Sequence, residues 1–214
     1  MNLRIEWLGH SCFRLTGDGV SVVIDPYADD MIPGLAPLRC TADAVFCSHN
    51  HDDHGCTANV SLTSRSPELT AERLVVPHDD CGGTKYGLNR IHIFTLGGAR
   101  VAHFGDIGSL PDAAQLARLK KLDAALIPIG GKYTLDAAAA DALARAITPR
   151  VVIPMHYRTD AFGFDDIGTL SAFTALRGDV CESPDHSFVL EDDTPVQTLV
   201  LAYCPDAAAK SPKS

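Results

Sequence analysis

Positive charge is scarce in this sequence. Its 214 residues contain 18 Lys and Arg against 27 Asp and Glu, so the formal net charge is −9 at pH 7. A protein that binds nucleic acid needs a basic face to neutralise phosphates, and this balance disfavours that class of partner. We therefore expect a small-molecule partner and no nucleic acid. A local basic pocket is still compatible with this charge balance.

Long apolar runs and paired cysteines are also missing. No stretch approaches the ~20 residues that span a bilayer, and Met1–Glu6 lacks the apolar segment of a signal peptide. The seven cysteines are scattered and form no C-x-x-C pair, so neither a disulfide framework nor a thiolate zinc site is indicated. These absences predict a cytoplasmic protein with reduced thiols and no membrane association.

A linker rich in Pro, Gly or Ser is absent as well. A chain of this length can bury one sizeable core. We expect a single domain over residues 1–205 and a flexible tail over 206–214, because the last residues have little to bury.

What is present are short apolar, β-branched runs, typical of strands. The predicted strands are 3–8, 12–15, 20–24, 44–47, 74–76, 91–96, 100–103, 124–127, 151–153, 187–190 and 198–203. Gly17-Asp18-Gly19 predicts a hairpin. Helical patterns cover 112–121 and 135–147, and Thr134 is the expected N-cap of the second. Many strands followed by interspersed helices favour an α/β sandwich with helices on its outer faces.

The run His49-Asn50-His51-Asp52-Asp53-His54 follows one of these strands. In extended backbone, side chains two residues apart point to the same side, so His49 and His51 can converge on one cation. Asp53 and His54 add an oxygen and a nitrogen donor. This mixture suits zinc, manganese or iron(II) better than calcium or magnesium. A metal site is a better explanation of the run than a solvated polar loop.

The pattern H-x-H-x-D-H after a short apolar strand resembles the signature of the metallo-β-lactamase superfamily. Other segments are similar to its branch containing L-ascorbate-6-phosphate lactonase and related uncharacterised metal-dependent hydrolases: Trp7–Phe13, Asp25-Pro26, Gly105-Asp106, Ile127–Gly131 and Ile153–Tyr157. The resemblance implies a four-layer αββα sandwich, in which two mixed β-sheets are flanked by helices. It also implies two divalent metal ions, with zinc favoured and manganese or iron as alternatives.

The same resemblance implies a set of ligands. His49, His51 and a later histidine would hold the first metal; Asp53, His54 and His156 would hold the second; Asp106 would bridge both. His78, followed by Asp79-Asp80 and Gly82-Gly83, is similar to a segment of this branch and is the favoured third histidine. His103, three residues before Asp106, is its rival.

Other polar residues are candidates for orienting the ligands. Asp25 ends a predicted strand, where a carboxylate could hold a ligand imidazole, and a simple turn is the alternative. His10 and His103 are further candidates for this role. Ser11 is a poor nucleophile candidate, because no G-x-S-x-G elbow surrounds it. We interpret His92 and His186 as structural.

These features predict a hydrolase. A water that bridges two divalent cations is largely hydroxide near neutral pH and can attack carbonyl or phosphorus, and Asp53 is the expected catalytic residue that orients it and shuttles a proton. The expected substrate is a small ester, lactone or phosphoester, including anionic sugar derivatives. The candidate substrate contacts are Lys132, Tyr133, Lys85 and Arg158.

Two other functions stay open at this point. One is a nucleotide phosphodiesterase or nuclease-type hydrolase, and the other is a non-catalytic metal-binding sensor. The apolar segment Met31–Leu35 is expected to form either a pocket lid or an interface, so a homo-oligomer is also open.

Overall fold

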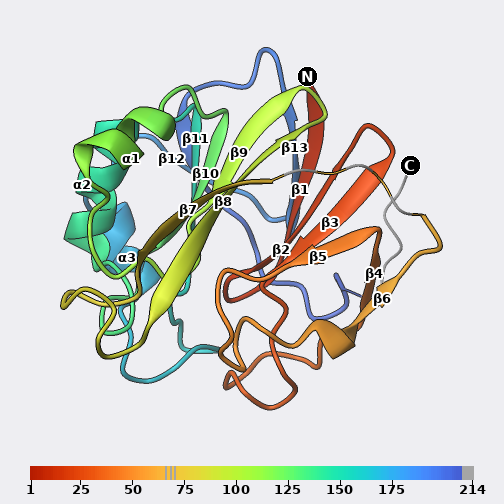
Figure 1. The fold of residues 1–214 in the computed structure, drawn as a ribbon, viewed down its shortest axis with the longest axis horizontal. Coiled ribbons are helices and arrows are strands. Elements are labelled where there is room, and N and C mark those ends of the chain that lie inside the picture. The colour runs from red at the N-terminus through yellow and green to blue at the C-terminus, as the bar shows by residue number, and fades with distance from the viewer. Residues whose placement is uncertain (66, 68, 70, 209–214) are drawn as a thin grey trace.

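Two β-sheets packed face to face form the centre of the protein (Figure 1). The computed structural model describes residues 1–65, 67, 69 and 71–208. The first sheet has the strand order β13-β1-β2-β3-β5, and β5 is parallel to β3 while its other pairs are antiparallel. Its strands are β1 (Asn2–Gly9), β2 (Cys12–Gly17), β3 (Val20–Ile24), β5 (Ala44–Phe46) and β13 (Ser187–Glu191).

The second sheet has seven strands in the order β12-β14-β11-β10-β9-β8-β7. The pairs among β7, β8 and β9 are antiparallel, and those from β9 through β10, β11 and β14 to β12 are parallel. Its central strands β10 and β11 are buried along their whole length, as expected for parallel strands covered on both faces. The strands are β7 (Ala71–Pro77), β8 (Leu88–Leu96), β9 (Ala99–His103), β10 (Ala124–Pro128), β11 (Val151–Met155), β12 (Val180–Glu182) and β14 (Gln197–Val200).

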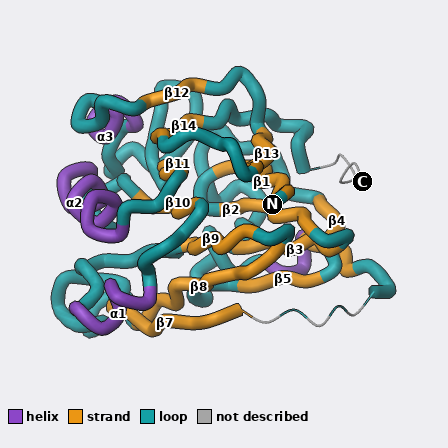
Figure 2. The backbone as a smooth tube through the Cα atoms, turned by 90° about the horizontal axis from the view of Figure 1, so that it is seen from above, coloured by secondary structure: helices purple, strands orange, loops and turns teal. Residues whose placement is uncertain are grey.

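Three helices lie on the outer face of the seven-stranded sheet (Figures 1 and 2). They are α1 (Ala113–Arg118), α2 (Ala137–Ile147) and α3 (Leu170–Thr174). Helix α2 buries Ala140, Leu143, Ala144 and Ile147, spaced three to four residues apart so that they share one face. These side chains join the main core, which also contains Leu3, Ile5 and Trp7 of β1.

The outer face of the five-stranded sheet is covered differently. Leu8 and Val23 point outward from β1 and β3 into a second apolar cluster with Tyr27, Leu38 and Val60. The short parallel pair β4 (Cys40–Ala42) and β6 (Val60–Leu62), the 3-10 turn η1 (Thr57–Asn59) and loops make up this layer. The predicted sandwich of two mixed sheets is therefore present, and among the described residues its α-helices all cover one side.

The predicted strands and both predicted helices are present, with one correction at a helix start. Asp136, not Thr134, caps α2: its carboxylate accepts a hydrogen bond of 2.8 Å from the backbone N of Ala139. The Thr134 hydroxyl instead donates to the carbonyl of Leu135, at 3.0 Å. An Asp three residues before a free backbone N–H competes well for this position.

The hairpin between β2 and β3 is confirmed. Asp18 and Gly19 have φ values of 50° and 74°, the left-handed conformation that two-residue hairpin turns require. None of the helices in the described ranges is long and apolar enough to cross a membrane.

The C-terminal end of the domain extends past the predicted boundary at 205. Ala207 and Ala208 are buried in the second apolar cluster, so small side chains are enough to hold this part of the predicted tail against the sheet. Residues 209–214 of the predicted tail lie outside the described residues.

Candidate metal centre

The candidate ligands come from the carboxyl ends of four strands. The run His49–His54 follows β5, His78 follows β7, Asp106 lies beyond β9 and His156 follows β11. Strands β7, β9 and β11 run in the same direction within their sheet, so their carboxyl ends meet at one edge. The fold thus brings together residues more than one hundred positions apart in the sequence.

The first group consists of His49, His51 and His78. One ring nitrogen of each lies within 4.8 Å of the others. The Nε2 atoms of His49 and His78 are 3.1 Å apart, and both side chains are buried, whereas His51 is exposed. Imidazole nitrogens that converge in this way are suited to share one cation.

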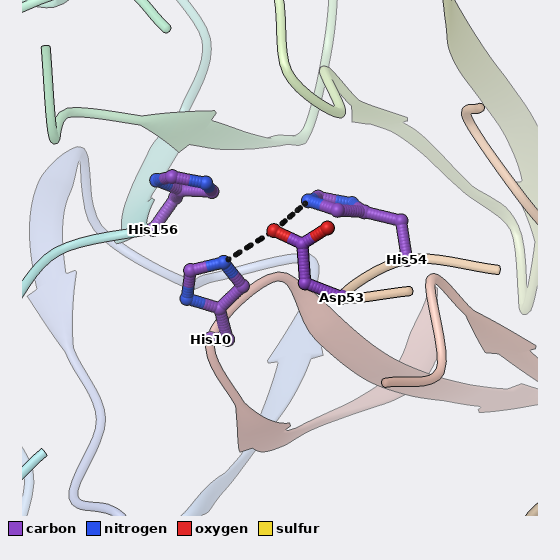
Figure 3. A group of neighbouring side chains, drawn as sticks. All are labelled: His10, Asp53, His54 and His156. Carbon is purple, nitrogen blue, oxygen red and sulfur yellow. Dashed lines mark ion pairs between the residues drawn. The ribbon is translucent and has the colours of Figure 1, made fainter. Parts of the chain in front are cut away.

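The second group consists of His10, Asp53, His54 and His156, again within 4.8 Å of one another. Figure 3 shows the carboxylate of Asp53 between His10 and His54. His156 lies beside His10, on the opposite side of the group from His54. The Asp53 Oδ2 atom is 3.5 Å from Nε2 of His10 and 3.5 Å from Nε2 of His54. Three imidazoles and one carboxylate therefore face a common point.

Asp106 lies between the two groups. Its Oδ1 atom is 3.2 Å from Nε2 of His54, and its Oδ2 atom is 3.2 Å from Nε2 of His156 and 3.5 Å from Nε2 of His78. The residue is only 2% exposed. One buried carboxylate thus contacts histidines of both groups, which is the position that a bridging ligand needs.

Several atoms of this centre lack the hydrogen bonds that burial normally demands. His54 Nε2, His156 Nε2 and Asp106 Oδ1 are buried and form no hydrogen bond. Leaving buried polar atoms unsatisfied costs about 1–3 kcal/mol each. Divalent cations with nitrogen and oxygen ligands would satisfy all three, so the residues present fit two such ions.

The protonation states of His49 and Asp106 are also suited to metal binding. Burial lowers the pKa of His49 to about 3, which keeps its ring neutral and able to coordinate. Burial raises the pKa of Asp106, but His156 and His54 outweigh this and hold that pKa well below its ordinary value. The bridging candidate is therefore an anion at neutral pH.

Comparison with known proteins agrees with this geometry. A family model described as the β-lactamase superfamily domain matches residues 4–156, most of the chain. The chain belongs to the metallo-β-lactamase superfamily. It is 29% identical over 212 residues to a UPF0173 metal-dependent hydrolase of Thermoplasma acidophilum, covering 84% of this chain and 92% of the relative. A UPF0173 metal-dependent hydrolase of Methanoregula boonei is 30% identical, covering 76% and 88%.

A solved structure is similar over nearly the whole fold. It is a proposed Zn-dependent hydrolase of the metallo-β-lactamase superfamily from Thermotoga maritima, with a TM-score of 0.72 and 28% identity. The match covers 94% of this chain and 100% of that one. The fold is thus the metallo-β-lactamase fold, as expected from the sequence, but among the described residues the outer face of the five-stranded sheet is not covered by α-helices.

A buried hydrogen-bond network orients two of the candidate ligands. The Asp25 carboxylate accepts from His54 Nδ1 at 2.8 Å and from the Ser48 hydroxyl at 2.6 Å. Because the Ser48 proton is directed to Asp25, the Ser48 oxygen accepts from His49 Nδ1, at 2.9 Å. Both histidines are thereby held with Nε2 toward the centre, as expected of groups that support metal ligands.

His103, the alternative to His78 as third histidine of the first group, does not lie beside His49 and His51. His103 Nε2 donates to the carbonyl of Ser11 at 2.8 Å, and its Nδ1 accepts from the backbone N of Gly105 at 3.1 Å. Its two nitrogens are thus occupied, and the structure brings His78 rather than His103 to His49 and His51.

His92 and His186 belong to none of the groups: His92 Nε2 contacts the carbonyl of Cys47 at 3.0 Å, and His186 Nε2 lies 3.9 Å from Glu6.

Asn89, which sequence reasoning missed, and Gly105 fix Asp106. Asn89 accepts a hydrogen bond from the backbone N of Asp106 at 3.0 Å and donates to the carbonyl of Phe104 at 2.8 Å. Gly105 has φ 52°, and a Cβ there would lie 2.2 Å from Asn89 Oδ1 and 2.4 Å from Ser48 Cβ. The glycine just before Asp106 was the available signal for this close approach.

A cavity of about 450 Å³ opens over the two groups. Of the candidate substrate contacts, Tyr133 lines it, whereas Lys85 and Lys132 line a neighbouring cavity of about 400 Å³. Lys132 is paired with Asp166, and Arg158 Nε donates to the carbonyl of Ile167 at 2.9 Å. The cavity over the metal groups is lined by Met31, Asn50, His51, Asp52, Asp53, His78, Tyr86, Asp106, Tyr133 and Phe164.

Proposed function

We propose that this protein is a hydrolase that holds two divalent cations and cleaves a small-molecule ester, lactone or phosphoester. The observation that carries the proposal is the position of Asp106 between two groups of histidines. The names of its relatives, metal-dependent hydrolases, agree with it.

Each half of the centre has its own ligands in this proposal. His49, His51 and His78 hold one cation, Asp53, His54 and His156 hold the other, and Asp106 bridges them. Cations bound there would supply a nucleophilic water at neutral pH and polarise the oxygen under attack. Zinc fits this nitrogen-rich donor set best, and manganese and iron are the alternatives.

Asp53 is the proposed catalytic side chain. It lies at the boundary of the buried ligands and the cavity, with 13% of its side chain exposed. Its carboxylate can orient the attacking water and carry the proton to the departing alcohol. In the balanced reaction, water oxygen bonds to the acyl carbon, the ester C–O bond breaks, and the alcohol leaves protonated.

His10 is proposed as a positioning residue in this scheme. It is buried, its Nε2 atom lies 3.5 Å from Asp53, and its ring centroid lies 4.0 Å from that of His156. The expected small-molecule partner, the cytoplasmic location and the oligomeric state stay predictions.

The test is turnover by the protein loaded with zinc or manganese. The substrates are 4-nitrophenyl esters, aliphatic and aromatic lactones, and bis(4-nitrophenyl) phosphate. We expect hydrolysis of at least one class, and a loss of kcat of about 100-fold or more in Asp53→Asn. Asp185→Asn, at an exposed aspartate away from the cavity, is the matched control. Inactivity of a protein that binds two metals would instead support the sensor function.

A further inference from the structure

The cavity over the metal groups has aromatic and apolar walls. Tyr86, Tyr133, Phe164 and Met31 surround it, and no Lys or Arg is among its lining residues in the described ranges. We propose that the substrate's substituent beyond the reacting carbonyl is uncharged and apolar, and that it binds between Tyr86, Tyr133 and Phe164. This inference rests on the proposed hydrolase function and replaces the expected anionic sugar with a neutral ester or lactone.

One wall of the cavity is held in place by Asp79. Its carboxylate accepts hydrogen bonds from the backbone N of Gly83 at 2.6 Å, Lys85 at 2.8 Å and Tyr86 at 2.9 Å. Asp79 directly follows His78, and the Tyr86 ring lies 5.5 Å from the His78 ring between centroids. A ring fixed in this way loses little conformational entropy when a ligand packs on it.

Tyr133 and Phe164 are also held by neighbouring side chains. The Tyr133 hydroxyl donates to Asp166 at 3.1 Å, and the Tyr133 ring meets the Tyr86 ring edge to face at 5.6 Å. The Phe164 ring packs at right angles on His10, with centroids 5.5 Å apart. With the Tyr133 hydroxyl engaged by Asp166, its ring is what the wall offers to a ligand.

Lys85 and Lys132, the lysines nearest to these rings, line a different cavity. Lys85 Nζ lies 4.5 Å from the Tyr86 ring centroid, and Lys132 Nζ lies 5.4 Å from the Tyr133 centroid, while Lys132 is also paired with Asp166. Both lysines line the neighbouring cavity, which shares only Tyr86 and Tyr133 with the cavity over the metal groups.

An anionic substituent would therefore be poorly accommodated. The cations would meet the reacting carbonyl. The rest of the substrate meets the rings, the amide of Asn50 and the carboxylate of Asp52, and no Lys or Arg among the described lining residues replaces its lost hydration. An apolar substituent gains from the same contacts, because burying its surface is favourable. The volume of about 450 Å³ lies in the range of small-molecule sites.

The sharpest test compares two esters of equal length and reactivity. These are 4-nitrophenyl hexanoate, with a methyl end, and mono-4-nitrophenyl adipate, with a carboxylate at the same position. In both, water oxygen bonds to the acyl carbon and 4-nitrophenol leaves with the ester oxygen. We expect kcat/KM of the zinc-loaded protein to be at least about tenfold higher for the hexanoate. An equal or higher value for the adipate overturns the inference.

Variants of the wall provide a second measurement, the ratio of kcat/KM for hexanoate to that for acetate. Tyr133→Ala and Phe164→Ala are expected to lower this ratio about tenfold, because the longer acyl chain loses its contact. Tyr133→Phe keeps the ring but loses the hydrogen bond to Asp166, and as the matched comparison it is expected to lower the ratio much less than Tyr133→Ala. Met31→Lys, at the exposed edge of the cavity, is expected to shift preference toward the adipate. An unchanged ratio in both alanine variants would count against the aromatic site.

The outcomes separate this inference from the proposed function. If the metal-loaded protein cleaves bis(4-nitrophenyl) phosphate or the adipate in preference to the hexanoate, only the inference on substrate class is overturned. If a protein with two bound metals cleaves none of these three compounds and none of the lactones, the proposed function is overturned with it.

Discussion

At the scale of single residues, Ser48 links the two halves of the metal centre. It bonds to Asp25, which holds His54, and it accepts from His49. Ser48 is completely buried, so water cannot replace its hydroxyl. A change at this one oxygen should thus affect candidate ligands in both groups.

We predict that Ser48→Ala weakens metal binding by about 10- to 100-fold, because His49 loses the partner of its Nδ1. Competition with a chromophoric chelator measures the affinity, and Ser48→Thr, which restores a hydroxyl, should recover most of it. Ser61→Ala, at an exposed serine of β6, is the control. Wild-type affinity in Ser48→Ala would show that the network does not support the ligands.

Some residues of the candidate site could be predicted from the sequence, and others could not. His49 to His54 could be found because four donor side chains rarely occur together, and Asp25 because a carboxylate ends a strand. Ser48 and Asn89 could not, because such polar residues are common and only the fold directs them at ligands. Lys132 was a candidate substrate contact because it follows Gly130-Gly131 at the end of a strand. In the structure it lines the neighbouring cavity, whereas Tyr133 lines both cavities.

At the scale of elements, most strands and the two longer helices were predictable from their apolar patterns, including the three-residue β5, but three other short strands and the shortest α-helix were not. The strands β4, β6 and β12 have three residues each, and α3 has five. These lengths are too short for a period of two or 3.6 residues to be recognised. Tertiary contacts rather than local sequence must hold them.

One such contact joins the short elements to the five-stranded sheet. Asp43, between β4 and β5, accepts from the Ser21 backbone N at 2.8 Å, the Ser21 hydroxyl at 2.9 Å and the Thr63 hydroxyl. Arg65 adds an ion pair at 3.1 Å. Burial raises the pKa of Asp43, but these hydrogen bonds and Arg65 outweigh it, so the pKa is lowered.

A lowered native pKa gives a defined pH dependence. The stabilisation is fully present above the unfolded-state pKa of about 4 and is lost as pH falls toward the lower native pKa. Asp43→Asn should therefore reduce the free energy of unfolding by about 2 kcal/mol at pH 7, and the deficit should shrink below pH 4. Urea denaturation at several pH values measures it, with Asp193→Asn at an exposed site as control. A deficit that does not change with pH would contradict this account of Asp43.

At the scale of the whole molecule, the candidate metal centre lies between the two sheets. His10, Asp25 and the run His49–His54 belong to loops of the five-stranded sheet, whereas His78, Asp106 and His156 belong to loops of the seven-stranded sheet. The cations would thus be held across the interface of the sandwich. This arrangement could be expected from the family resemblance but not from spacing alone, because only the packing of the sheets brings the two sets together.

The number of metals bound per chain tests the central claim most directly. Elemental analysis of protein reconstituted with zinc and then desalted should give two ions for the wild type, and about one or fewer for Asp106→Asn or His78→Gln. His103→Gln, checked for folding by circular dichroism, should still bind two. A wild type that binds a single ion or none, or a His103→Gln variant that loses an ion while His78→Gln keeps both, would contradict the proposed dinuclear centre.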